Sequence, residues 1–74
     1  MEIRPYGRPI DGGHEMIQLE YCPERGLYGF TVYSLIHELV TFCHFPVLTK
    51  FEAMDKVAAR IHSTDAVNTA LVGA

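Results

Sequence analysis

The stretch EMIQLEYCPERGLYGFTVY, residues 15–33, decides the fold of this 74-residue chain. In its first part, from Glu15 to Tyr21, apolar side chains recur at every second position. One face carries Ile17, Leu19 and Tyr21, and the other carries Met16, Gln18 and Glu20. A period of two is typical of a strand with one buried face, so we predict a strand here.

A turn and a second strand follow directly. CPERG, residues 22–26, places Pro23 at the second position of a turn and leaves Gly26 free to adopt positive φ. From Leu27 to Tyr33 the chain is again apolar and contains β-branched Thr31 and Val32, which favour the extended state. Residues 15–33 therefore predict a β-hairpin, with Tyr33 on the face opposite Tyr28, Phe30 and Val32.

The next segment, SLIHELVTFCHF (residues 34–45), fits two periods. As a helix capped by Ser34 it would gather an apolar stripe, made of Leu35, Ile36, Leu39, Val40 and Cys43. As a strand from near Glu38 it would set Val40, Phe42 and His44 opposite Leu39, Thr41 and Cys43. We favour the strand and keep the helix as the alternative.

An amphipathic helix is expected from about Lys50 to His62. Thr49 and Glu52 have the spacing of a capping box. KFEAMDKVAARI then places apolar residues on one face, namely Phe51, Met54, Val57, Ala58 and Ile61. The C-terminal residues DAVNTALVGA fit either a short helix capped by Thr64 or Asp65 or a terminal strand, and the sequence leaves both open.

These elements predict a single α+β domain over residues 1–74. Residues 1–13 contain two prolines and three glycines and are interpreted as an N-terminal arm, with at most an edge strand at Glu2 to Tyr6. Residues 14–62 form a sheet and helix core, and residues 63–74 a C-terminal segment. We expect a small antiparallel sheet of about three strands with one amphipathic helix on one face; a β-hairpin plus two helices is the alternative.

Composition and charge restrict the classes of function. The chain is 49% hydrophobic and 20% charged, as a folded domain requires. The N-terminal residues do not form a secretory signal, no uncharged run is long enough to span a membrane, and two cysteines do not make a disulfide framework. We therefore expect a cytoplasmic protein with reduced thiols. A net charge of −3 with scattered basic residues argues against nucleic acid and suits contact with a basic protein surface.

The segment HELVTFCHF, residues 37–45, raises the question of a metal or catalytic site. His37, Cys43 and His44 lack the paired spacing of structural zinc ligands, with or without Cys22. No orienting Asn or Asp accompanies a Cys and His pair in a recognisable context. We expect no metal, no cofactor and no enzymatic activity.

Surplus apolar surface instead predicts binding to proteins. A chain of this size buries only about three-fifths of its unfolded surface, so one sheet face should stay uncovered. We predict an interface that contains Tyr33, Thr31, Tyr6 and Glu20, with Tyr33 as its exposed aromatic. A larger protein partner and a homodimer are both expected to use this surface.

Two resemblances bear on function. Strands followed by a helix, with Lys50, Ala53 and the Ala58–Ala59 pair, make residues 14–62 resemble the second half of a double-stranded RNA-binding domain. That resemblance implies nucleic-acid binding, with Lys50, Lys56 and Arg60 on or near one helix. In size and layout the chain also resembles small phage-encoded inhibitors of the anti-CRISPR kind, which implies a non-enzymatic inhibitor or regulator of a larger protein. We take the inhibitor as the expected function and the nucleic-acid-binding half-domain as the alternative.

Overall fold

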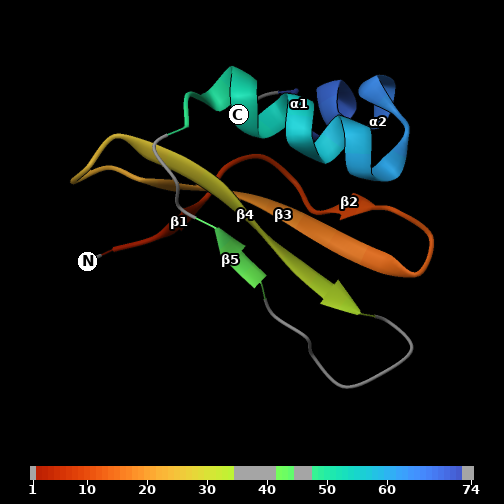
Figure 1. Cartoon of the computed structure of the whole chain (residues 1–74), viewed down its shortest axis with the longest axis horizontal. Coiled ribbons are helices and arrows are strands. Elements are labelled where there is room, and N and C mark those ends of the chain that lie inside the picture. The colour runs from red at the N-terminus through yellow and green to blue at the C-terminus, as the bar shows by residue number, and fades with distance from the viewer. Residues whose placement is uncertain (1, 35–41, 45–47, 73–74) are drawn as a thin grey trace.

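The computed structural model describes residues 2–34, 42–44 and 48–72, and for Ser34 and residues 42–44 it describes the backbone alone. Its strands are β1 (Arg4–Pro5), β2 (Ile10–Asp11), β3 (Glu15–Cys22), β4 (Leu27–Ser34) and β5 (Phe42–His44). Its helices are α1 (Lys50–Ile61) and α2 (Thr64–Ala70). Figure 1 shows both helices on the same side of the sheet. The predicted α+β class, a small antiparallel sheet with helix on one face, is confirmed.

The predicted hairpin forms the centre of the sheet. β3 and β4 pair antiparallel over their full lengths, with Ile17 opposite Val32 and Leu19 opposite Phe30. The turn closes on Cys22, whose carbonyl oxygen accepts from the backbone N–H groups of Arg25 and Gly26 at 3.3 and 2.8 Å. Gly26 has φ of 65°, so the glycine takes the positive φ for which the sequence suggested it.

The segment interpreted as an arm contributes to the sheet. β1 and β2 both pair antiparallel with β3, with Pro5 opposite Glu20 and Ile10 opposite Ile17. Ile10 is buried in the core. The edge strand expected at Glu2 to Tyr6 is thus present but short, and a second short strand follows it.

The ambiguous segment ends in a strand. β5 pairs antiparallel with β4, which places Cys43 opposite Thr31 and His44 opposite Phe30. Residues 35–41 lie outside the described residues, so the choice between helix and strand is settled only at 42–44. The order of the sheet is β1-β3-β4-β5, with β2 also on β3.

α1 begins and ends close to the predicted residues. The Thr49 hydroxyl accepts from the backbone N–H of Glu52 at 3.2 Å, as the capping spacing predicted. At the other end His62 adopts φ of 55° and its N–H donates to the Ala58 carbonyl, which terminates the helix in a left-handed cap.

The C-terminal segment forms a helix, which settles the alternative that the sequence left open. Its N-cap is Ser63, whose Oγ accepts from the N–H of Ala66 at 3.2 Å. Thr64 and Asp65, the two caps considered from the sequence, lie inside the first turn of α2.

The core lies between the two helices and the sheet. Its buried members are Ile10, Ile17, Leu19, Phe30, Val32, Ala53, Val57, Val67 and Ala70. One predicted member is wrong: the Phe51 residue is 65% exposed, and Ala53 takes the position against the sheet. Phe51 lies in the first turn of α1, where its ring contacts Lys50, with the Lys50 Nζ 5.1 Å from the ring centroid.

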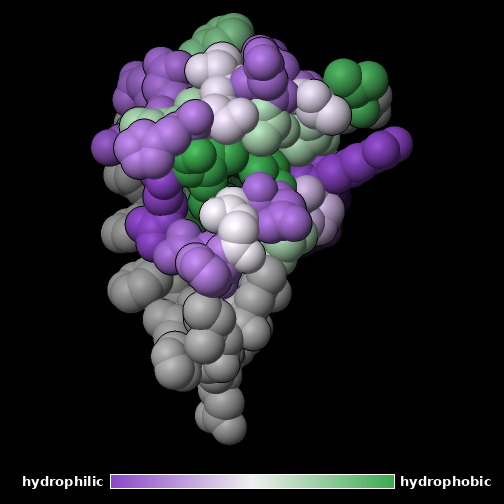
Figure 2. Space-filling view, turned by 90° about the vertical axis from the view of Figure 1, so that its right-hand side faces the viewer, coloured by the Kyte–Doolittle hydropathy of each residue, from purple (hydrophilic) through white to green (hydrophobic). Residues whose placement is uncertain are grey.

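Figure 2 views the end of the molecule that carries the turn between β2 and β3. Hydrophobic residues gather in the middle of this end, with hydrophilic residues around them. The turn is close to α1, because a Cβ added at Gly12 would lie 2.9 Å from Cγ2 of Ile61.

Candidate functional site

The sheet has one face turned away from α1 and α2, which we call the distal face. Side chains alternate along a strand, so every second residue of β3 and β4 points toward the core and the residues between them point to the distal face. On β3 and β4 the distal face consists of Met16, Gln18, Glu20, Cys22, Leu27, Gly29, Thr31 and Tyr33. No helix of residues 2–34, 42–44 and 48–72 packs on this face, since both helices contribute to the core on the other.

A hollow of about 410 Å³ lies on the distal face. It is lined by Pro9, Met16, Ile17, Gln18 and Tyr33. Met16 and Tyr33 are directly opposite each other on β3 and β4, and Asp11 on β2 is opposite Met16. Met16 and Tyr33 both line the hollow, whereas Asp11 does not.

A bulge in the edge of the sheet helps to form this hollow. Between the pairs Pro5 with Glu20 and Ile10 with Ile17, the edge has four residues where β3 has two. The side-chain amide of Gln18 binds this bulge, because its Nε2 donates to the carbonyl oxygen of Gly7 at 3.2 Å; it also donates to that of Leu19 in β3 at 2.8 Å. The Arg8 N–H donates to the Ala70 carbonyl at 2.8 Å, which ties the bulge to α2. Pro9 is consequently held beside Met16.

Glu20 and Thr31 form a polar contact on the distal face. The Thr31 hydroxyl donates a hydrogen bond to Oε1 of Glu20. Thr31 is only 3% exposed, so this carboxylate satisfies a buried hydroxyl. The contact fixes the position of an acidic group on the same face as the hollow.

Of the four predicted interface residues, the structure brings three together. Tyr33, Thr31 and Glu20 all lie on the distal face, as the alternation of the hairpin implies. Tyr6 does not join them: it packs against the core, with its ring 5.4 Å from that of Tyr28 at an interplanar angle of 76°. The Tyr21 ring also lies close to that of Tyr28, with the centroids 4.9 Å apart and the planes tilted by 33°. Burial among these rings raises the pKa of Tyr28 above its usual value.

Four of the five residues lining the hollow, all except Tyr33, were not in the predicted interface, and Ile17 was expected in the core. Met16 and Gln18 could have been found, because the alternation that places Ile17 and Leu19 in the core places them on the other face. No pattern in the sequence predicts that Pro9 and Tyr33 line the same hollow, because the position of Pro9 depends on the bulge.

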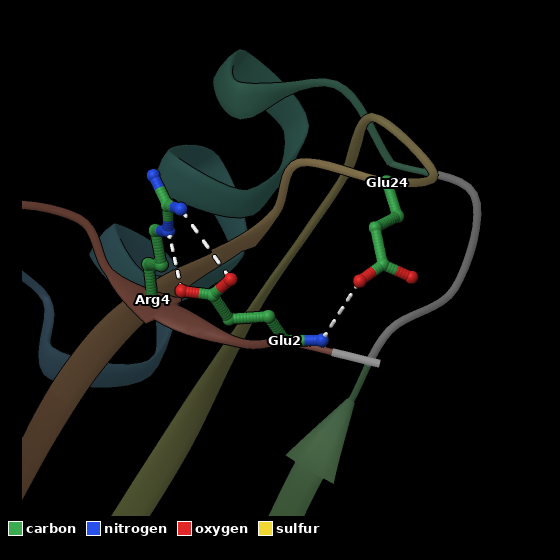
Figure 3. A network of polar contacts seen from close by, with 3 residues as sticks. All are labelled: Glu2, Arg4 and Glu24. Carbon is green, nitrogen blue, oxygen red and sulfur yellow. Dashed lines mark hydrogen bonds and ion pairs between the residues drawn. The ribbon is translucent and has the colours of Figure 1, made fainter.

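A polar network at the hairpin end borders the sheet (Figure 3). Arg4 forms an ion pair with Glu2, Nε to Oε1 at 2.9 Å, and the Glu2 N–H donates to Oε1 of Glu24 at 3.3 Å. The hydrogen bond from Arg4 and its charge lower the pKa of the Glu2 carboxyl. All three residues are exposed, and ion pairs of this kind stabilise a protein little.

A second hollow, of about 320 Å³, lies between β2 and α2. Arg8, Pro9, Ile10 and Asp11 line it from the edge of the sheet, and Ala66, Thr69 and Ala70 line it from the helix. This second hollow lies beside the bulge, and Arg8 is one of the residues on its wall.

The residues considered for metal binding or catalysis do not form a described site. Cys22 is a buried free thiol, His37 lies outside the described residues, and Cys43 and His44 are described by their backbone alone. Within the described parts of the chain, no three His, Cys, Asp or Glu residues are grouped so that they could hold a metal ion. In those same parts no helix is long and apolar enough to cross a membrane.

Two of the three cationic side chains on α1 make contacts within the chain. Arg60 forms an ion pair with Glu15 of β3, and Lys50 lies over the Phe51 ring. Of the three cations near this helix, Lys56 alone has no contact assigned among the described residues.

Comparison with known proteins found no match: no protein-family model, no curated protein and no solved structure matches this chain.

Proposed function

We propose that this protein is a non-enzymatic binding module that attaches to a larger protein through its distal face. The observation that carries the proposal is the hollow beside Tyr33, on the sheet face that α1 and α2 leave uncovered. Interfaces concentrate their binding energy in aromatic and aliphatic anchors at the centre of a contact, and Tyr33 and Met16 are such residues.

The proposed effect of binding is inhibition or regulation of the partner. A 74-residue chain can cover a working surface of a larger protein, as the small phage-encoded inhibitors of the anti-CRISPR kind do. The net charge of −3 favours a partner with a basic surface, including one that otherwise binds nucleic acid.

Self-association through the same face is part of the proposal. Two distal faces packed about a twofold axis would cover Tyr33 of each copy in one self-complementary contact. The dimer and the complex with a partner would then exclude each other. Light scattering at micromolar concentration tests this: the dimer requires a mass of twice 8.3 kDa in the wild type and monomer mass in Tyr33→Glu.

A cytoplasmic location is also proposed. It is supported by Cys22, whose thiol is buried and free, as is usual for proteins of a reducing compartment.

Affinity capture from the native host, followed by mass spectrometry, tests the proposed function. The tagged wild-type chain should enrich one larger protein that Tyr33→Glu does not enrich, because a buried unpaired carboxylate is costly at an interface. Phe51→Ser is the control, since it removes an exposed aromatic side chain from α1, away from the distal face. Loss of the partner with Phe51→Ser and not with Tyr33→Glu would contradict the proposal, as would salt-dependent binding to RNA at micromolar affinity.

A further inference from the structure

We propose that Tyr21 and Tyr28 form an oxidative cross-linking site, at which a one-electron oxidant joins the two rings as dityrosine within one chain. The oxidant is a haem peroxidase that uses hydrogen peroxide. This inference does not depend on the proposed function, because both rings lie on the sheet face opposite the distal face.

The strand register holds the two rings against each other. Tyr21 of β3 and Tyr28 of β4 are directly opposite, at the end of the hairpin that carries its turn (Figure 1). Opposite residues of antiparallel strands have Cβ atoms about 4.5–5.5 Å apart. The ring centroids are 4.9 Å apart and the ring planes are tilted by 33°. At this separation the rings overlap face to face, because rings lying side by side in one plane would have their centroids further apart.

This arrangement suits the coupling of two phenols. Each hydroxyl group loses one hydrogen atom to the oxidant, which leaves a radical that is shared with the ring carbons beside the hydroxyl. A bond then forms between one such carbon of each ring, and the hydrogen atoms on those two carbons move to the oxygens and restore both aromatic rings. The two hydrogen atoms removed from the phenols reduce one hydrogen peroxide to two waters. The cross-linked chain has therefore lost two hydrogen atoms.

Ring orientation selects this pair over the other tyrosines. The new bond forms between p orbitals that stand perpendicular to the ring planes, so the two rings must face each other. The ring of Tyr6 also lies near that of Tyr28, at 5.4 Å, but the planes meet at 76° and the orbitals do not point at each other. Tyr33 lies opposite Met16, and among the described residues no ring contact is assigned to it. All four tyrosines are half-buried, so exposure does not distinguish them.

Treatment of the full-length chain with a haem peroxidase and hydrogen peroxide tests the inference. At low protein concentration we expect dityrosine fluorescence and a single-chain mass that has fallen by two hydrogen atoms. Arg25 is the one tryptic site between Tyr21 and Tyr28, so in a tryptic digest the cross-link should join the peptide that ends at Arg25 to the one that begins at Gly26. If the wild type stays unlinked, or if every product joins two chains, the inference is wrong.

Four matched variants identify the tyrosines that react. Tyr21→Phe and Tyr28→Phe keep the rings but remove the hydroxyl groups, and each should abolish the cross-link within the chain. Tyr6→Phe and Tyr33→Phe make the same change at the other two tyrosines and should leave it in place. A cross-link that survives Tyr21→Phe, or one that is lost with Tyr6→Phe, would overturn the assignment to Tyr21 and Tyr28.

The cross-link would tie β3 to β4 beside their turn. A covalent link between two positions of a chain restricts the unfolded state, as a disulfide does. The cross-linked chain should therefore unfold at a higher urea concentration than the untreated chain. Peroxidase-treated Tyr28→Phe is the control for other oxidation, and its midpoint should not rise. A cross-linked wild type with a midpoint no higher than that of the untreated chain would contradict this stabilising effect.

Discussion

Glu15 at the start of β3 and Arg60 in the last turn of α1 form a two-point ion pair. Arg60 Nε lies 2.9 Å from Glu15 Oε2, and its Nη2 lies 2.9 Å from Oε1. The two residues are 45 positions apart, so the pair joins the C-terminal end of α1 to the sheet. Arg60 is also well placed for the helix dipole, which favours a cation in the last turn.

Replacing Arg60 by methionine should lower the free energy of unfolding at neutral pH by about 0.5–1 kcal/mol. The effect is small because the two side chains are 42% and 35% exposed. Urea denaturation measures it, with Lys56→Met as the matched control on the same helix.

The pH dependence of this difference gives a second measurement. The hydrogen bond from Arg60 lowers the pKa of the Glu15 carboxyl below its usual 4.5, against an opposing effect of burial. A carboxyl with a lowered pKa contributes its stability above the pKa of the unfolded state and loses it as the pH falls through that of the folded state. The gap between wild type and Arg60→Met should therefore close in acid below about pH 4.5. A gap of constant size down to pH 2–3 would contradict the role of this pair.

Ser63 should matter more to α2 than Thr64. Its Oγ accepts from the Ala66 N–H, so Ser63→Ala leaves that donor without its cap and should cost about 1 kcal/mol. Thr64 is exposed, and Thr64→Ala should change stability by less than about 0.5 kcal/mol. Thermal unfolding of the two variants decides the matter, and a larger loss with Thr64→Ala would place the cap where the sequence suggested.

Phe51 and Val57 test which face of α1 packs on the sheet. Val57 is fully buried, so Val57→Ala should cost about 2–3 kcal/mol through lost burial and a cavity. Phe51→Ser should cost no more than about 1 kcal/mol, because the ring is mostly exposed and loses mainly its contact with Lys50. If Phe51→Ser proved the more damaging, the orientation of α1 would be wrong.

The hairpin and α1 could be predicted from the sequence because local patterns determine them. Alternation in residues 15–21 assigns each side chain to a face, and the Thr49 cap marks where α1 begins. The position of Phe51 could not be predicted, because an apolar stripe does not say which of its flanks meets the sheet. A small residue, Ala53, takes that place and allows the helix to approach closely.

The short strands and the hollow are set by long-range contacts, and the sequence carries no periodic signal for them. β1 and β2 have two residues each, too few for a period to appear. The distal placement of Tyr33, Thr31 and Glu20 followed from the hairpin, whereas Tyr6, predicted with them, packs against the core instead. Tyr6 lies just past β1, and its N–H donates to the Leu19 carbonyl, which turns its ring toward Tyr28.

Gly7 holds the bulge that shapes the hollow, and its replacement gives the last prediction. Gly7 has φ of 82°, and a Cβ added there would lie 2.6 Å from Leu71 Cδ2 and 2.8 Å from the Ala70 carbonyl oxygen. The leucine side chain can move aside, but the carbonyl belongs to the backbone at the end of α2 and already accepts from Arg8. Gly7→Ala must therefore strain the backbone and also push the bulge away from α2.

Gly13→Ala separates these two effects. Gly13 has φ of 95°, yet nothing lies within 4 Å of an added Cβ, so this variant should show the cost of positive φ alone, about 1–2 kcal/mol. Gly7→Ala should cost about 1–3 kcal/mol more, as overpacking does. Because the Gly7 carbonyl accepts from Gln18, Gly7→Ala should also shift the NMR signals of Gln18 and Met16, which Gly13→Ala should leave in place. Equal losses of stability in the two variants, with Gln18 unshifted, would mean that the bulge does not depend on the contact between Gly7 and α2.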